Sequence, residues 1–173
     1  MRVFVGIPIS QEFKKFIKPV MEEVAEIEGN FSIVSPDNLH FTLMFLGHAD
    51  PSAIIKKLAE ISFKAFNISL KGLGSFDKRI IWAGTVSKEL DSLANLIRKQ
   101  LNSFKADDKP FQSHVTLARI KSLQNIEDLN IVIKKYEHFK FGEMKVDRFI
   151  LYNSDLSSGK PVYVRIKEFK LVD

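Results

Sequence analysis

Two of the four histidines in this 173-residue chain stand in the same pattern, His40-Phe41-Thr42-Leu43 and His114-Val115-Thr116-Leu117. The chain has only three threonines, so a random placement would set one two residues after each of two histidines in about two chains per thousand. The repeated pattern therefore constrains the fold strongly, because it requires two imidazoles and two hydroxyls in equivalent surroundings.

The segments that carry the pattern are predicted to be strands. Leu39–Leu46 and Val115–Ile120 are short, apolar and rich in residues that favour strands. Turn-forming residues bound both of them: Pro36-Asp37-Asn38, Gly47 and Lys109-Pro110. Side chains alternate between the faces of a strand, so each histidine and the threonine two residues later lie on one face, roughly 7 Å apart. Phe41, Leu43, Val115 and Leu117 are then expected in the core.

The rest of the chain mixes the periodicities of helices and strands. The spacing of apolar residues predicts four helices: Ser10–Ile27, Asp50-Pro51 to Ser62, Ser87–Ser103 and Asn125–Tyr136. Strands are predicted at the N-terminus and in four further segments: Ala65–Leu70, Arg79–Val86, Glu143–Asn153 and Pro161–Phe169. Pro19 lies inside the first helix, where it is expected to cause a kink or a division into two helices.

This order predicts an α+β fold. The chain between the two patterns is long enough for each to belong to its own lobe. We therefore expect a single domain, residues 1–173, in a bilobal pseudo-twofold arrangement. Two antiparallel sheets would line a central cleft, with helices on the outer faces. No repeat beyond the four-residue pattern supports the duplication.

The composition limits the class of protein. The chain has no cysteine, which excludes disulfides, cysteine nucleophiles and thiolate metal sites. It has no apolar run of about eighteen residues and no signal peptide, so we expect a cytoplasmic protein without a membrane partner. A net charge of +5 favours an anionic partner, although most lysines are spread along predicted helices, as on an ordinary solvated surface.

Two imidazoles that face one cleft suit general acid and base catalysis, because histidine can be neutral in one copy and protonated in the other near pH 7. A phosphodiester fits this arrangement. One histidine would deprotonate the attacking oxygen, the other would protonate the leaving oxygen in line, and Thr42 and Thr116 would hold the non-bridging oxygens. The scheme requires no metal and no other cofactor.

Two other interpretations of the histidines stay open. A lone histidine in a strand is more often a hydrogen-bonded core residue, but core packing does not need a threonine at the same offset twice. A zinc site would need further ligands, and no carboxylate spacing near His40 or His114 supplies them.

At these residues the chain resembles the 2H phosphoesterase superfamily, and within it the bacterial and archaeal RNA 2′,3′-cyclic phosphodiesterases, also called 2′-5′ RNA ligases. The resemblance extends over almost the whole chain. Four segments carry it: Arg2–Ile7, Pro36–Gly47, Arg79–Gly84 and Phe111–Arg119. Ser113 departs from the family, which usually has proline there, but this position carries no catalytic group.

The resemblance implies hydrolysis of a terminal 2′,3′-cyclic phosphate on RNA, with the 3′ oxygen leaving and a 2′-phosphate as product. By analogy His114 activates the water and His40 protonates the leaving oxygen, although the near-symmetric patterns do not themselves order these roles. Thr42 and Thr116 would bind the phosphate. The expected partner is RNA with such an end, tRNA fragments among the candidates, and the expected state is a monomer.

Further residues are candidates around this site. Arg119 is expected on the face of Thr116, where it would add a fixed positive charge, and an ordinary surface arginine is an equal alternative. By family analogy Phe45 stacks on a nucleobase, but alternation from His40 places it with the core, which is the preferred interpretation. Trp82 either walls the cleft or packs in its strand. Three basic residues are candidates for the RNA path: Arg79, Arg148 and Lys160.

Two competing functions remain. The same site could join a 2′,3′-cyclic phosphate end to a 5′-hydroxyl by reversal of the transfer, although hydrolysis should dominate in water. A binding module that recognises RNA ends without turnover is the other. For a binding module, replacing His40 or His114 would weaken the binding of RNA. For an enzyme, the same replacement would abolish catalysis and leave RNA binding largely unchanged. Two intact patterns favour the enzyme.

Overall fold

The structure is a computed structural model that describes residues 1–104 and 110–173. Lys109, expected in the turn before the second histidine pattern, lies outside the described residues. In chain order the elements are β1 (Arg2–Pro8), α1 (Gln11–Ala25), β2 (Gly29–Ile33), a 3₁₀ turn (Pro36–Asn38), β3 (His40–His48), α2 (Pro51–Leu58), β4 (Phe66–Lys71), β5 (Leu73–Phe76), β6 (Ile80–Gly84), α3 (Lys88–Gln100), β7 (His114–Leu123), α4 (Ile126–Tyr136), β8 (Lys140–Val146), β9 (Arg148–Asp155) and β10 (Val162–Lys170).

All four predicted helices are present, and their starts follow from capping residues. The carboxylate of Asp50 accepts a hydrogen bond from the amide of Ser52 at 3.1 Å, and Pro51 begins α2. This helix ends at Leu58 rather than at the predicted Ser62. Helix α1 runs through Pro19 without dividing, so of the two expected outcomes, a kink or a division, the division is wrong.

The strand predictions need two corrections. The segment predicted as one strand, Glu143–Asn153, belongs to two strands, β8 and β9, which are separated at Asp147. Strands β2 and β5 were missed. Strand β2 is mostly exposed and therefore lacks an apolar signal, and β5 has only four residues, one of which is Gly74.

The strands form one eight-stranded antiparallel sheet and a separate antiparallel pair, so the predicted α+β class is confirmed. The large sheet has the order β10-β9-β1-β3-β7-β6-β5, with β2 also paired to β7, and the small sheet pairs β4 with β8. Strands β3 and β7 meet at a single residue pair, Phe41 with Val115. The two sheets that were expected are therefore joined into one sheet at this pair.

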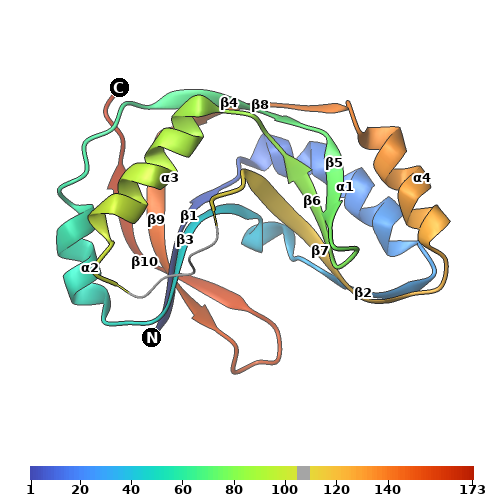
Figure 1. Ribbon diagram of the computed structural model, residues 1–173, viewed down its shortest axis with the longest axis horizontal. Helices are drawn as coiled ribbons and strands as arrows, with labels where there is room; N and C mark the ends of the chain where they lie inside the picture. The colour runs from blue at the N-terminus through green and yellow to red at the C-terminus, as the bar shows by residue number, and fades with distance from the viewer. Residues whose placement is uncertain (105–109) are drawn as a thin grey trace.

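The helices lie beside different parts of this sheet (Figure 1). Helix α3 contacts β3 and α2 contacts β10, whereas α4 contacts β5 and α1 contacts β2. The two-stranded sheet packs against both a helix and the large sheet, since β8 contacts α1 and β4 contacts β6.

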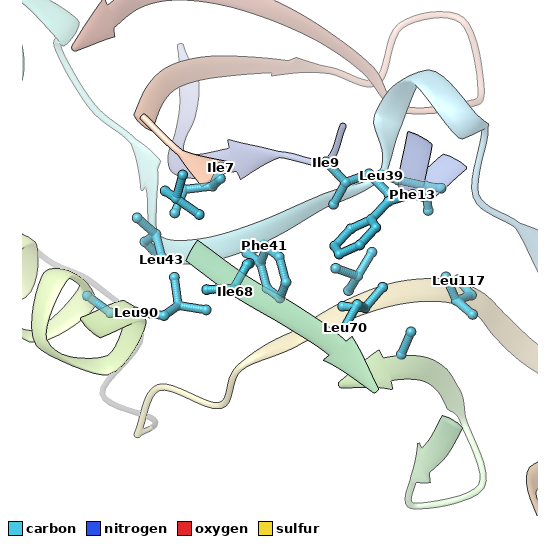
Figure 2. Close-up of a cluster of buried hydrophobic side chains, with 14 of the residues drawn as sticks. Ile7, Ile9, Phe13, Leu39, Phe41, Leu43, Ile68, Leu70, Leu90 and Leu117 are labelled. Atoms are coloured by element: carbon cyan, nitrogen blue, oxygen red, sulfur yellow. The ribbon is translucent and has the colours of Figure 1, made fainter. Parts of the chain in front are cut away.

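The core lies on the face of the sheet opposite to the two histidines. Figure 2 shows Phe41 and Leu43 of β3 packed near Ile68 and Leu70 of β4, with Leu117 of β7 in the same cluster. The side chains expected in the core, Phe41, Leu43, Val115 and Leu117, are all no more than 1% exposed. Burial of each such side chain contributes roughly 1.5–3 kcal/mol to folding, so the alternation that buries them also fixes the face on which the histidines lie.

Candidate active site

The single pair between β3 and β7 brings the two histidine patterns together. Phe41 and Val115, which stand between the histidine and the threonine of each pattern, are antiparallel partners. Antiparallel partners are related by a local twofold axis, and their neighbours face each other in reverse order. His40 thus lies across from Thr116, and Thr42 lies across from His114. The four predicted side chains share one face of the sheet.

Strand β3 bends directly after its threonine. Its pairing with β1 joins Thr42 to Gly6 and Phe45 to Phe4, and leaves Leu43 as an extra residue in a β-bulge. Because Phe4 and Gly6 share one face of β1, Phe45 and Thr42 also share a face. Phe45 is half-buried and packs against a small buried cluster of Phe4, Ile150 and Tyr152. The preferred interpretation of packing is therefore met, but on the histidine side of the sheet and not in the main core.

Strand β7 carries the same irregularity at the equivalent residue. Its pairing with β6 joins Thr116 to Trp82 and Arg119 to Ile80, and leaves Leu117 as the extra residue. Arg119 therefore lies on the face of Thr116, where it was expected, although strict alternation over three residues would have put it on the opposite face. Trp82 lies on this face too.

The ring of His40 is held at both nitrogens. Nδ1 lies 2.6 Å from the backbone carbonyl of Asn38, which can only accept, so Nδ1 carries the proton. Nε2 lies 2.9 Å from the hydroxyl of Thr42. Burial lowers the pKa of His40 to about 4; the bond to Asn38 acts in the opposite direction, and the charge of His114 lowers the pKa further.

His114 is oriented in the same way but is less enclosed. Its Nδ1 donates to the carbonyl of Gln112 at 2.7 Å, so in the neutral ring Nε2 is again the nitrogen without a proton. Burial lowers the pKa of His114, the bond to Gln112 raises it, and the charge of Arg119 lowers it. The two imidazoles therefore have the same tautomer and different surroundings.

Aromatic side chains that the sequence analysis missed surround both histidines. The ring centroid of His40 lies 4.9 Å from that of Phe4 and 5.1 Å from that of Tyr163, which stands edge-on to it. Phe76 stands edge-on to His114 with the centroids 5.0 Å apart. Single aromatic residues in distant strands give no local sequence signal for such contacts.

Gly6 could have been found from the sequence, since a glycine inside a strand often marks a close approach of another group. A Cβ at this position would lie 2.9 Å from the carbonyl oxygen of Phe41 and 3.2 Å from Cδ2 of His40. The absence of a side chain at Gly6 therefore makes room for the His40 ring.

Trp82 lies flat against two glycines. A Cβ at Gly74 or Gly84 would collide with the indole ring, which also lies 5.1 Å from the ring of Phe76 between centroids. The indole Nε1 is buried and has no hydrogen-bond partner within the described part of the chain. Packing is therefore part of the role of Trp82, although its ring lies on the face of Thr116.

The three basic candidates for the RNA path differ in position. Arg79 is exposed in the turn between β5 and β6, and Lys160 is exposed between β9 and β10. Arg148 is held by two carboxylates, Asp147 at 2.8 Å and Glu168 at 3.2 Å. The described contacts do not join any of them to a histidine.

Neither a metal cluster nor a membrane-spanning helix is found in the described ranges. No group of three histidine, aspartate or glutamate side chains there could hold a metal ion. No helix there is both long and apolar enough to cross a membrane.

Comparison with known proteins gives full-length matches. Residues 4–171 match the family model of the AKAP7 2′5′ RNA ligase-like domain. The RNA 2′,3′-cyclic phosphodiesterase of Aquifex aeolicus is 37% identical over 99% of this chain and 97% of its own. The protein of the same name from Archaeoglobus fulgidus is 34% identical over 98% of this chain and 100% of its own.

Solved structures show the same fold. The apo form of E. coli LigT aligns with a TM-score of 0.80 and 26% identity, covering 99% of this chain and 98% of that chain. The complex of E. coli LigT with 3′-AMP aligns with a TM-score of 0.83 and 25% identity over the same shares.

Proposed function

Because the chain belongs to the family of RNA 2′,3′-cyclic phosphodiesterases and 2′-5′ RNA ligase-like proteins, we propose that it hydrolyses the 2′,3′-cyclic phosphate at an RNA end to a 2′-phosphate. The observation that supports this reaction most directly is the pairing of Phe41 with Val115. It sets two histidines of the same tautomer, each with a threonine, around one local twofold axis. Acid and base can then act on opposite sides of one phosphorus.

In the proposed reaction His114 acts as the base and His40 as the acid. Nε2 of His114 takes a proton from water, whose oxygen bonds to phosphorus while the bond from phosphorus to O3′ breaks. Nε2 of His40 gives its proton to O3′, and the phosphate stays on O2′. Thr42 and Thr116 donate hydrogen bonds to the non-bridging oxygens, and Arg119 offsets their growing charge.

The low pKa of His40 in the free protein places a condition on this scheme. A histidine with a pKa of about 4 is almost entirely neutral near pH 7, yet the acid must carry a proton. A phosphate anion beside the ring favours the charged imidazolium and raises its pKa. We infer that the substrate itself brings His40 into the protonated state.

The arrangement of the chain around this site is proposed to be bilobal. Strands β1, β3, β9 and β10 form one lobe, and β2, β5, β6 and β7 form the other, within a single domain of residues 1–173. Two features support this division: among the described residues the strands of the two lobes pair only at Phe41 and Val115, and β3 and β7 both bulge at the leucine after the threonine. The cleft between the lobes would hold the RNA end.

The test uses a short RNA with a 2′,3′-cyclic phosphate end, incubated in EDTA with wild type, His40→Ala and His114→Ala. His48→Ala is the matched control, because His48 is exposed at the far end of β3. We expect a 2′-phosphate product from wild type and His48→Ala, and almost none from the other two variants.

Two other outcomes would indicate a different function. RNA that is bound but left intact by wild type would indicate a binding module. Joining to an added 5′-hydroxyl RNA in preference to hydrolysis would indicate a ligase.

A further inference from the structure

A pocket of about 360 Å³ opens beside His40. Asn38 lines it from the 3₁₀ turn, His40 from β3, Tyr152 from β9, and Tyr163 and Arg165 from β10. Its volume is within the range of roughly 300–1,000 Å³ that is usual for small-molecule sites. The reaction at phosphorus needs His40 but does not use this pocket.

The pocket is lined by four cations, of which one, Arg165, has no carboxylate partner among the described residues. Lys14 pairs with Asp37 at 3.2 Å, and Lys145 pairs with Asp173 at 2.8 Å. Arg148 is paired as well, with Asp147 and Glu168.

Arg165 makes no ion pair with any residue that the structure describes. It is the strand partner of Tyr152 and therefore lies on the same face as that ring. An uncompensated guanidinium is suited to a phosphodiester, which it can bind through two parallel hydrogen bonds.

The wall between Arg165 and His40 is aromatic. The ring centroid of Tyr163 lies 5.1 Å from that of His40, and the centroid of Tyr152 lies 6.3 Å from it. Both rings pack with Phe4, at 4.9 Å for Tyr163 and 5.0 Å for Tyr152. Fixed aromatic rings next to a cation are the usual surface for single-stranded nucleic acid.

The direction of the reaction places the RNA on this side. In an in-line displacement the attacking water and the leaving oxygen lie on opposite sides of phosphorus. If His114 activates the water and His40 protonates O3′, the ribose lies on the His40 side. The chain then continues from that ribose toward the preceding nucleotide, and the basic pocket is adjacent.

We propose that this pocket binds the phosphodiester that joins the terminal nucleoside to the preceding one, with Arg165 on the phosphate and the two tyrosines against the sugar and base. The inference rests on the proposed function and extends it to a substrate class. The enzyme should prefer oligonucleotides with a cyclic phosphate end to 2′,3′-cyclic mononucleotides, which have no such phosphodiester.

The test compares kcat and KM for 2′,3′-cyclic AMP and for a dinucleotide that ends in a 2′,3′-cyclic phosphate. Arg165→Ala should raise KM for the dinucleotide roughly tenfold or more, the effect of losing a hydrogen bond to a charged group, and leave the mononucleotide unchanged. Arg165→Lys should restore part of the loss. Lys167→Ala is the matched control, because it removes the same charge from β10. Lys167 is the strand partner of Leu151, so its side chain lies on the face of the sheet opposite to that of Arg165 and Tyr152.

The dependence of kcat/KM on salt concentration separates the loss of a phosphate contact from a structural defect, which would not change this dependence. For the dinucleotide, the slope of log(kcat/KM) against log[KCl] should be less steep in Arg165→Ala by about 0.7, the value for one lost phosphate contact on a single strand. Two results would overturn the inference and leave the proposed function standing: no preference of wild type for the dinucleotide, or an equal loss on both substrates in Arg165→Ala. Failure of wild type to hydrolyse either substrate would overturn both.

Discussion

The buried, neutral state of His40 should make the stability of the protein depend on pH. The folded pKa is about 4, against about 6.5 in the unfolded chain. As pH falls below 6.5 the unfolded chain takes up a proton that the folded protein refuses until about pH 4, so the free energy of unfolding falls across this window. This linkage gives a loss of about 2 kcal/mol between pH 7 and pH 5, and of about 3 kcal/mol by pH 4.

The substitution His40→Gln removes this linkage, because glutamine does not titrate. Urea unfolding at pH 7 and pH 5 measures the effect for wild type, His40→Gln and the exposed control His48→Gln. Wild type and His48→Gln should each lose about 2 kcal/mol more on acidification than His40→Gln does. Other groups, His114 included, are present in all three proteins and cancel in the difference. Parallel losses in wild type and His40→Gln would refute the assignment of a buried, neutral His40.

Three further predictions concern the same face of the sheet. The plot of kcat/KM against pH should be bell-shaped with its maximum below pH 6.5, because burial lowers the pKa of both His40 and His114; a rate that rises through pH 7 would contradict this. Thr42→Val removes the hydroxyl 2.9 Å from Nε2 of His40 and should lower kcat by about 10- to 100-fold, whereas the serine variant should keep most of the rate. Gly74→Ala should destabilise the protein by roughly 1–3 kcal/mol in urea unfolding, because its Cβ would collide with the indole of Trp82, and an unchanged midpoint would contradict this contact.

The sequence predicted the histidine strands well up to the point where each one bends. Alternation from His40 correctly placed Thr42 beside it and Phe41 in the core, because both residues precede the bulge. Phe45 follows the bulge at Leu43, and alternation predicted the wrong face of the sheet for it, although it does pack against buried side chains. A bulge is set by the pairing with a neighbouring strand, here β1, and a single strand's sequence does not record which of its residues is unpaired.

The aromatic surroundings of the site could not be predicted for a related reason. Tyr152 and Tyr163 come from the last two strands of the chain, and their contacts with His40 depend on the order β10-β9-β1-β3. Local periodicity shows that these residues lie in strands, but not which strands are neighbours. The helices were predicted more accurately because capping and apolar spacing are local properties, as at Asp50 and Pro51.

The two histidine patterns are nearly identical in sequence, and yet their surroundings differ. Phe4 and Tyr163 enclose His40, whereas Phe76 and the charge of Arg119 accompany the more open His114. In the proposed mechanism the difference between acid and base would thus come from strands outside the patterns, and for this reason the patterns alone do not order the roles. Since enclosure keeps His40 neutral in the free protein near pH 7, the charge of the bound phosphate would raise the pKa of His40 and so increase the fraction of the acid that is protonated at a given pH.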